Sequence, residues 1–314
     1  MAETPTVLVT GGAGFVGATL VRRLVGSGYD VRVLDNLTTG HLSHLEGVDV
    51  EVIDGDIRDA AALDRALAGA GSLVHLAASG SVVMSVADPA ANFDVNVLGT
   101  FQVLDAARRA GIHRVVQAST GGALIGDATP PVNEASLPKP ISPYGASKLA
   151  GEGYAHAFAK AYGLGTVALR FANVYGPWSA RKKGAMTLFF RAIDAGEPIV
   201  IYGDGLASRD YTHVDDICRA LQLALESNLE GGTVLHIASG IETTVQELAD
   251  LCRVAAGVPD HPIEHREKRP GEVERNFASY DLAKEVLGYE PTIAREEGIR
   301  RTWEWFREFV FADR

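Results

Sequence analysis

Short apolar segments alternate with helix-length amphipathic segments through the first half of the chain, and this alternation limits the possible folds more than any other feature. The apolar segments include "TVLVT", "VRVLD", "SLVHLA", "RVVQAS" and "TVALRFA", and they are apolar on both faces. Strands that are buried on both faces are typical of a parallel sheet with helices on each side. The sequence therefore predicts an α/β fold with a doubly wound parallel sheet.

The second half of the sequence has a different texture. After "NVYGP" the loops lengthen, helical segments become isolated and proline and glycine recur. We expect a smaller C-terminal α/β substrate lobe, formed by residues 175–210 and 239–314. The larger domain spans residues 1–174 and is joined by roughly 211–238, because the amphipathic segment "THVDDICRALQLALE" is typical of a helix that returns to it.

Charge and composition limit the kinds of partner. The 314 residues include 29 basic and 40 acidic side chains, a net charge of −11, which argues against electrostatic binding to nucleic acid or an anionic membrane. The N-terminus enters a strand directly and no apolar run approaches the ~20 residues of a membrane span, so we expect a cytoplasmic protein. Cys218 and Cys252 lie in separate apolar helical patterns, which favours buried thiols over a disulfide or metal site.

Three glycines stand between the first predicted strand and the first predicted helix. Gly11, Gly14 and Gly17 permit a tight turn, a close approach of backbone to a pyrophosphate, and close packing of helix on strand. Asp35 ends the second predicted strand, where a carboxylate accepts hydrogen bonds from ribose hydroxyls and repels a 2′-phosphate. The pattern predicts a Rossmann dinucleotide site that prefers NAD to NADP; the alternative is a glycine-rich turn without a ligand.

A tyrosine and a lysine stand four residues apart in "SPYGASKLAGE", at the start of a predicted helix. The spacing places Tyr144 and Lys148 on one face of that helix. A cation beside a phenol favours the phenolate, so the pair can act as a general acid and base. The spacing alone also fits an exposed helical pair without a catalytic role.

These two motifs occur with "HLAA", "NVLGT", "RFANVYGP", "RDYTHVDD" and "RPGE", in an order that resembles the extended short-chain dehydrogenase/reductase family. The resemblance covers nearly the whole chain and points to the NAD-dependent nucleotide-sugar epimerase/dehydratase branch. It implies that Tyr144 is the catalytic base, that Lys148 binds the cofactor ribose and lowers the pKa of Tyr144, and that NAD is the cofactor. The implied NAD-binding residues are Gly11, Gly14, Phe15, Val16, Gly17, Asp35, Asn36, Asp56, Ile57, Leu76, Ala77, Ala78, Asn96, Tyr144, Lys148 and Phe171.

The segment "VVQASTGGALIG" begins as a buried strand and ends in two hydroxyls and two glycines. Many members of the family place a catalytic Ser or Thr where this chain has Gly121. The resemblance therefore implies that Thr120, with Ser119 second, binds the 4-oxygen of the sugar. We also expect open space at Gly121 and Gly122, which would admit a rotating or larger sugar.

The two glycines also bear on the reaction. Dehydratases of this family place Asp-Glu directly after the catalytic Thr, whereas this chain has Gly121-Gly122. The resemblance thus implies 4-epimerisation: the 4-hydroxyl is oxidised to a ketone by hydride transfer to NAD, and the hydride returns to the other face. The alternatives are a dehydratase or reductase of a nucleotide sugar, and a non-catalytic NAD-binding regulator, which the intact Tyr-Lys pair disfavours.

The substrate implied by the resemblance is a UDP-sugar. Arg209 and Arg269 would clamp its diphosphate, Asn173 would contact it, and Ile201 and Tyr202 would pack against the uracil ring. Arginine suits this role because its guanidinium makes planar bidentate contacts to phosphate. Ordinary surface charges are the alternative for both arginines.

Three adjacent cations, Arg181, Lys182 and Lys183, follow the "NVYGP" segment. Close to the expected sugar site they can recognise a carboxylate at C6, as in UDP-glucuronic or UDP-galacturonic acid. A solvated basic loop or a phosphate-steering patch is the alternative, and UDP-glucose or UDP-galactose remains the default substrate. The helices expected near 92–110 and 144–161 are apolar over wide faces, and in the family such helices commonly form a two-fold dimer contact, so the resemblance implies a homodimer.

Overall fold

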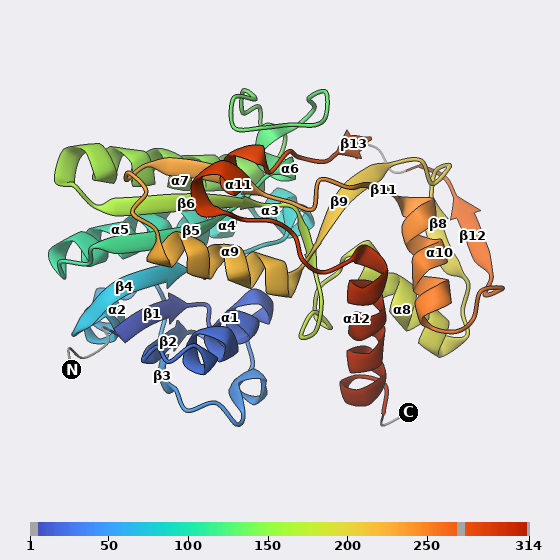
Figure 1. Cartoon of the computed structure of the whole chain (residues 1–314), viewed down its shortest axis with the longest axis horizontal. Helices are drawn as coiled ribbons and strands as arrows, with labels where there is room; N and C mark the ends of the chain where they lie inside the picture. The colour runs from blue at the N-terminus through green and yellow to red at the C-terminus, as the bar shows by residue number, and fades with distance from the viewer. Residues whose placement is uncertain (1–5, 269–273, 313–314) are drawn as a thin grey trace.

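A seven-stranded parallel sheet forms the centre of the larger domain in the computed structural model, which describes residues 6–268 and 274–312 (Figure 1). The strand order over these residues is β10-β6-β5-β4-β1-β2-β3. The predicted doubly wound α/β fold is confirmed. The strands are β1 (Thr6–Thr10), β2 (Val31–Asp35), β3 (Glu51–Asp54), β4 (Ala70–His75), β5 (Arg114–Thr120), β6 (Gly165–Phe171) and β10 (Thr233–Ile237).

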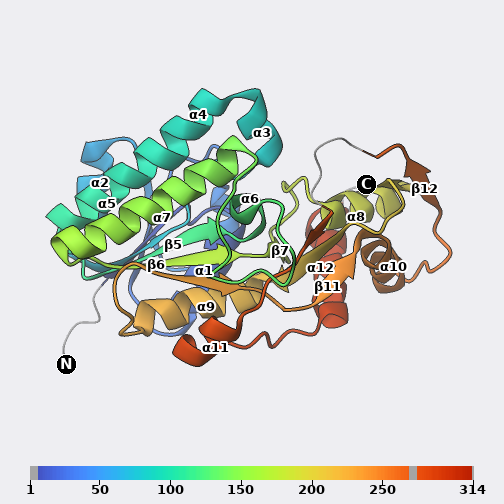
Figure 2. The same cartoon turned by 90° about the horizontal axis from the view of Figure 1, so that it is seen from above.

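Helices cover both faces of this sheet, as Figure 2 shows from above. Neighbouring side chains of β1 serve opposite faces: Val9 joins the apolar cluster under one layer of helices and Leu8 joins the cluster under the other. Both are fully buried. One layer consists of α1 (Phe15–Gly26), α9 (Val214–Glu226) and α11 (Asp281–Leu287), and the other of α2 (Ala60–Leu67), α5 (Gly99–Arg109) and α7 (Pro143–Tyr162).

Several short helices connect these elements, and the helix expected near 92–110 is divided. It consists of α4 (Pro89–Phe93), a π-helical turn η2 (Asp94–Leu98) and then α5. Asn96 in the π turn is buried, and its side chain holds Ser79 after β4 and Ser147 of α7. The other short helices are η1 (Leu42–Leu45), α3 (Val82–Ala87) and α6 (Gly122–Ile125).

The second lobe is a separate arrangement of short strands and helices around its own apolar cluster. Phe190, Leu248 and Phe306 lie at the centre of that cluster and are fully buried. Its strands are β7 (Asn173–Tyr175), β8 (Ile199–Tyr202), β9 (Ser208–His213), β11 (Glu242–Thr244), β12 (Ile263–Arg266) and β13 (Arg275–Asn276). Its helices are α8 (Ala185–Ala195), α10 (Val245–Ala255) and α12 (Arg295–Phe309).

The chain returns to the larger domain between these parts. Helix α9 packs against α1, and β10 pairs in parallel with β6 at the edge of the central sheet. The domain bounds given above stay predictions. Cys218 on α9 and Cys252 on α10 are both buried and unpaired, which confirms the expectation of buried thiols. Across the described residues, no helix combines the length and apolarity needed to cross a membrane.

Candidate active site

The carboxyl ends of β1 and β4 define the point where the strand order reverses, and the glycine-rich turn occupies it. Gly11 has a φ of +72°, and a Cβ atom there would lie 2.7 Å from the backbone nitrogen of Ala77. A Cβ atom at Gly17 would lie 2.1 Å from the carbonyl oxygen of Gly11. Side chains are therefore excluded from this turn, and its backbone faces the crevice where open α/β sheets bind their ligands.

A cavity of about 520 Å³, called here the glycine-loop pocket, opens above this turn. Thr38, Thr39, Arg58 and Trp178 line it although the sequence did not suggest them. Four of the expected NAD-binding residues are not among the described residues that line it: Asn96, Tyr144, Lys148 and Phe171. The lining includes most of the expected NAD-binding residues: Gly11, Gly14, Phe15, Val16, Gly17, Asp35, Asn36, Asp56, Ile57, Leu76, Ala77 and Ala78.

Two carboxylates are fixed along one wall of the glycine-loop pocket. Asp35 is buried, and its two oxygens accept hydrogen bonds from the backbone nitrogens of Ala13 and Leu37, each at 2.9 Å. Asp56 accepts two hydrogen bonds from the Arg58 guanidinium, both at 2.8 Å, which holds the pKa of Asp56 well below its usual range. Both groups thus present fixed acceptors where a Rossmann fold places adenosine.

Tyr144 stands in the first turn of α7, at the carboxyl edge of the sheet. The turn begins regularly: Ser142 caps it by accepting from the backbone nitrogen of Gly145 at 3.2 Å, and Pro143 occupies its first position. The hydroxyl of Thr120, the last residue of β5, is hydrogen-bonded to the Tyr144 phenol. The helix start and the strand end therefore bring one phenol and one alcohol together.

Burial controls the ionisation of Tyr144 and Lys148. Desolvation raises the pKa of Tyr144 to about 12, and the hydrogen bond with Thr120 opposes that rise. Lys148, one turn along α7, is buried and donates from Nζ to the carbonyl oxygen of Ala118 at 3.1 Å. Desolvation lowers the pKa of Lys148 to about 8. The net shift of the Tyr144 pKa is upward because burial of the phenol has the largest effect, and the expected lowering of this pKa by Lys148 stays a prediction.

Ser119 faces away from this pair. Its hydroxyl donates to Glu152 at 2.6 Å, and Glu152 forms a bidentate ion pair with Arg170 at 2.8 and 2.9 Å. All three side chains are buried. The serine thus belongs to a polar network between α7, β5 and β6, and the geometry favours Thr120 over Ser119 as the hydroxyl beside Tyr144.

The space beside the two glycines that follow is occupied. A Cβ atom at Gly121 would lie 3.2 Å from Nδ1 of the buried His236, and one at Gly122 would lie 3.2 Å from the amide of Asn276. The expectation of open space at these positions is therefore wrong. A side chain at either position would require His236 of β10 or Asn276 of β13 to shift, which no local sequence pattern indicates.

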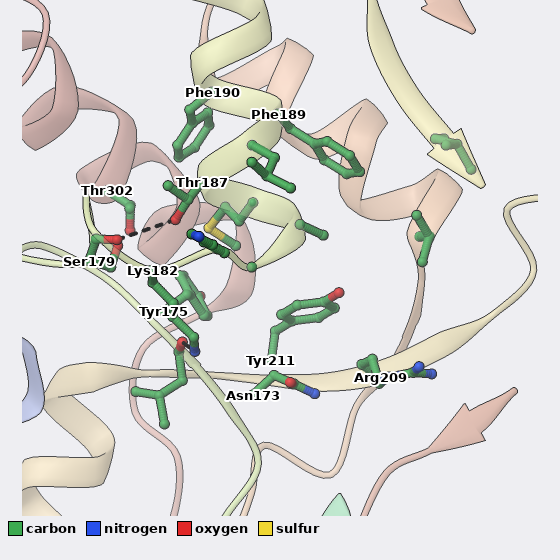
Figure 3. A pocket seen from close by; sticks show the side chains of 18 of the residues that line it. Asn173, Tyr175, Ser179, Lys182, Thr187, Phe189, Phe190, Arg209, Tyr211 and Thr302 are labelled. Atoms are coloured by element: carbon green, nitrogen blue, oxygen red, sulfur yellow. Dashed lines mark hydrogen bonds between the residues drawn. The ribbon is translucent and has the colours of Figure 1, made fainter. Parts of the chain in front are cut away.

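A second cavity of about 310 Å³, called here the second-lobe pocket, lies beside β7, α8 and β9 (Figure 3). Phe189 and Tyr211 add aromatic surface that the sequence did not suggest. Arg209 is held by its Nη1, which donates to the carbonyl oxygen of Ser208 at 2.7 Å. The predicted substrate residues that line the pocket are Asn173, Lys182, Lys183, Ile201, Tyr202 and Arg209.

Five of the predicted substrate residues have other outcomes: Thr120, Gly121 and Tyr144 are not among the described residues that line the second-lobe pocket, and Arg181 and Arg269 differ as follows. Arg269 lies outside the described residues. Arg181 lines the glycine-loop pocket with Asp35 and Asn36, and is not among the described residues that line the second-lobe pocket. The expected cluster of three cations around the sugar is thus divided between two cavities. The cause is the loop conformation, which turns successive side chains to different sides.

The two pockets and the pair between them define a class of protein. Leu76 to Ala78 of the glycine-loop pocket follow β4, Thr120 ends the neighbouring β5, and Asn173 of the second-lobe pocket follows β6. Two pockets with a phenol and an alcohol on the strand edge between them are typical of a dinucleotide-dependent enzyme. A family model for the NAD dependent epimerase/dehydratase family matches residues 7–238, and the chain belongs to this family.

Three similar proteins add detail. A UDP-glucose 4-epimerase of Mycolicibacterium smegmatis is 39% identical, over 96% of this chain and 98% of the relative. The crystal structure of UDP-glucose 4-epimerase with UDP-glucose from Thermotoga maritima has a TM-score of 0.92 at 37% identity, covering 97% of this chain and 99% of that one. The Thermus thermophilus UDP-glucose 4-epimerase in complex with NAD has a TM-score of 0.90 at 37% identity, with 97% and 100% covered. The predicted family and cofactor are confirmed.

Proposed function

We propose that this protein interconverts a UDP-hexose or a UDP-hexuronic acid with its 4-epimer. The observation that carries the proposal is the hydrogen-bonded pair of Tyr144 and Thr120 at the sheet edge between the two pockets. The glycine-loop pocket suits NAD, because its turn excludes side chains and Asp35 is held there as an acceptor. When bound, NAD supplies the hydride acceptor and a positive charge that favours the phenolate of Tyr144.

The side chains of this chain supply the proton transfer and the orientation of the sugar. Tyr144 takes the proton of the 4-hydroxyl as the ketone forms and gives it back when the alcohol is restored. Thr120 holds the 4-oxygen against the phenol. Asn173 and Arg209 in the second-lobe pocket bind the diphosphate, which leaves the sugar free to turn between the two half-reactions.

The family also contains dehydratases, and the residues after Thr120 argue against that reaction. Expulsion of a 6-hydroxyl needs a further acid and base beside the sugar. Gly121 and Gly122 offer no side chain, and their neighbours are the ring of His236 and the amide of Asn276. Desolvation lowers the pKa of His236 to about 3, so its ring is neutral and no acid at neutral pH. Return of the hydride to the 4-ketone is then the simplest completion.

A direct experiment can decide whether C6 of the sugar carries a hydroxyl or a carboxylate. Lys183 in the second-lobe pocket supports a C6 carboxylate, whereas the placement of Arg181 in the other pocket and of Lys182 along both weakens that argument. We expect NMR of the purified protein with UDP-glucose, UDP-galactose, UDP-glucuronate and UDP-galacturonate to show interconversion within one of the two pairs. A lack of interconversion in all four, or a loss of water, would contradict the epimerase proposal.

We also propose a homodimer in the cytoplasm. Apolar side chains are exposed on the layer formed by α3, α4, α5 and α7, which Figure 2 shows side by side; Val83 is 77% exposed, Val86 63% and Phe93 56%. Such a patch is typical of an interface. We expect analytical ultracentrifugation to give twice the chain mass, and the double variant Val86→Glu with Phe93→Glu to give one chain mass. A monomeric unaltered protein would contradict the proposal.

A further inference from the structure

The loop between β7 and α8, residues 176–184, runs along both pockets. Trp178 and Arg181 line the glycine-loop pocket, and Lys183 lines the second-lobe pocket. Lys182 lines both. Lys182 therefore lies where one cation can reach ligands in both pockets.

The ammonium of Lys182 lies between elements of the two domains. Nζ donates to the carbonyl oxygen of Val174 on β7 at 2.5 Å and lies 5.9 Å from the ring centre of Phe15 at the start of α1. Figure 3 shows the side chain reaching toward the strand that carries Asn173. An ammonium has three N–H donors, and the Val174 carbonyl uses one of them. The others can bind anions on either side.

Packing against distant segments holds this loop in place. The Trp178 ring lies 5.1 Å from the His44 ring and 5.3 Å from the Trp305 ring, and the Arg22 guanidinium lies 5.1 Å from its centre. These partners come from the larger domain and from α12. The next residue, Ser179, is also held, since its carbonyl oxygen accepts from the hydroxyl of Thr187 on α8 at 3.4 Å. The position of Lys182 between the pockets is thus built into the fold.

We propose that Lys182 couples the two binding sites: its ammonium contacts the diphosphates of both the cofactor and the nucleotide sugar, so each ligand binds more tightly when the other is present. The inference rests on the proposed function, which puts a diphosphate in each pocket. Two diphosphates that contact the same ammonium would lie close enough to repel each other. A cation between them offsets that repulsion, and the net charge of −11 makes the local cation more important.

The pKa of Lys182 provides a second way to detect this coupling, through proton uptake. The residue as a whole is exposed, but desolvation of its ammonium lowers the pKa of Lys182 to about 8. A bound anion favours the charged form and raises this pKa. Above pH 8, ligand binding should therefore be accompanied by proton uptake at Lys182.

The experiment is a calorimetric titration of UDP into NAD-depleted and NAD-saturated protein. The ratio of the two dissociation constants measures the coupling and is the same whichever ligand is bound first. We expect NAD to tighten UDP binding about fivefold or more in the unaltered protein, and Lys182→Met to lose most of this ratio. Lys182→Arg should keep it, since the charge is retained. Lys160→Met, on the exposed side of α7, is the matched control and should also keep it.

Two results would overturn the inference. Equal UDP affinity with and without NAD in the unaltered protein would show that the sites are independent. An unchanged ratio in Lys182→Met, with the variant shown to be folded by its melting curve, would remove Lys182 from the coupling. Titrations at pH 8.5 in buffers of different ionisation enthalpy should show proton uptake that Lys182→Met reduces. Because the readout is binding, its failure is distinct from a failure to epimerise any sugar.

Discussion

Lys148 and Lys182 make similar contacts on very different backbones. Each ammonium donates to one backbone carbonyl, of Ala118 and Val174 respectively, and desolvation lowers the pKa of each to about 8. Lys148 stands on α7, a helix of 20 residues packed on β5 and β6. Lys182 stands on the loop between β7 and α8. The comparison shows that a desolvated ammonium bonded to a backbone carbonyl can be positioned either by a regular helix or by the long-range packing of a loop.

The surroundings of the two ammonium groups differ in charge. The nearby carboxylate of Glu152 opposes the fall in the pKa of Lys148, and Arg170 holds that carboxylate in place. For Lys182, desolvation alone accounts for the shift in pKa. Lys148 thus has a carboxylate of the protein as its counterion, whereas Lys182, under the coupling proposed above, gains its counterions from the ligands. We call α7 with Lys148 and Glu152 the catalytic framework, and the loop that carries Lys182 the binding element.

The largest test of the catalytic framework is the variant Tyr144→Phe. It removes the phenolic oxygen while the helix and Lys148 remain, so we expect kcat to fall by about 10³-fold, within the range of general acid–base catalysis. NAD and UDP affinities should stay within about threefold, since the two pockets keep their lining. Steady-state kinetics and calorimetry measure both quantities. Tyr162→Phe at the exposed end of α7 is the control, and equal activities of the two variants would remove Tyr144 from the chemistry.

A smaller effect separates the two neighbouring hydroxyls of β5. Thr120→Val should lower kcat by about 30-fold at nearly constant stability, since the lost hydrogen bond is the one to Tyr144. Ser119→Ala should lower the free energy of unfolding by about 1–2 kcal/mol because the buried Glu152 loses a donor, while kcat changes less than fivefold. Urea unfolding and steady-state kinetics of both variants give the answer. The reverse assignment of effects would make Ser119 the catalytic hydroxyl.

The sequence predicted the parts of the site that depend on local geometry. The glycine turn, Asp35 at the end of β2 and the four-residue spacing of Tyr144 and Lys148 follow from a strand, a turn and a helix in order. The neighbours of Gly121 and the separation of Arg181 from Lys183 could not be predicted. They depend on side chains that only tertiary packing brings to the site, such as His236 from β10 and Trp305 behind the loop.

The ionisation of Tyr144 was beyond sequence reasoning for a related reason. The sequence shows that a lysine lies one helical turn away, but it does not show how far the phenol is removed from water. In the structure, desolvation raises the pKa of Tyr144 by more than the hydrogen bond with Thr120 lowers it. A spacing rule can identify the members of an acid–base pair, and the sign of the pKa shift requires the packed environment.

The smallest expected effect is a difference in the pH dependence of stability between variants of the two lysines. A lysine whose pKa is about 8 in the folded protein and 10.5 when unfolded destabilises the fold below pH 8, and this cost disappears as the pH rises toward 10.5. Lys148→Met should therefore raise the free energy of unfolding at pH 7 by about 1–2 kcal/mol, an advantage that shrinks between pH 8 and pH 10. Glu152 keeps its pair with Arg170, so the variant leaves no carboxylate without a partner.

Lys182→Met should show a weaker pH dependence, because only the ammonium end of this exposed residue is desolvated, whereas the whole Lys148 side chain is buried. Urea unfolding of both variants and the unaltered protein at pH 7, 8, 9 and 10 measures the difference. The tyrosines with raised pKa values contribute equally to all three proteins, so they cancel in the comparison. Equal pH profiles for the two variants would mean that the loop lysine is as desolvated as the helical one, and that the distinction between framework and binding element does not hold.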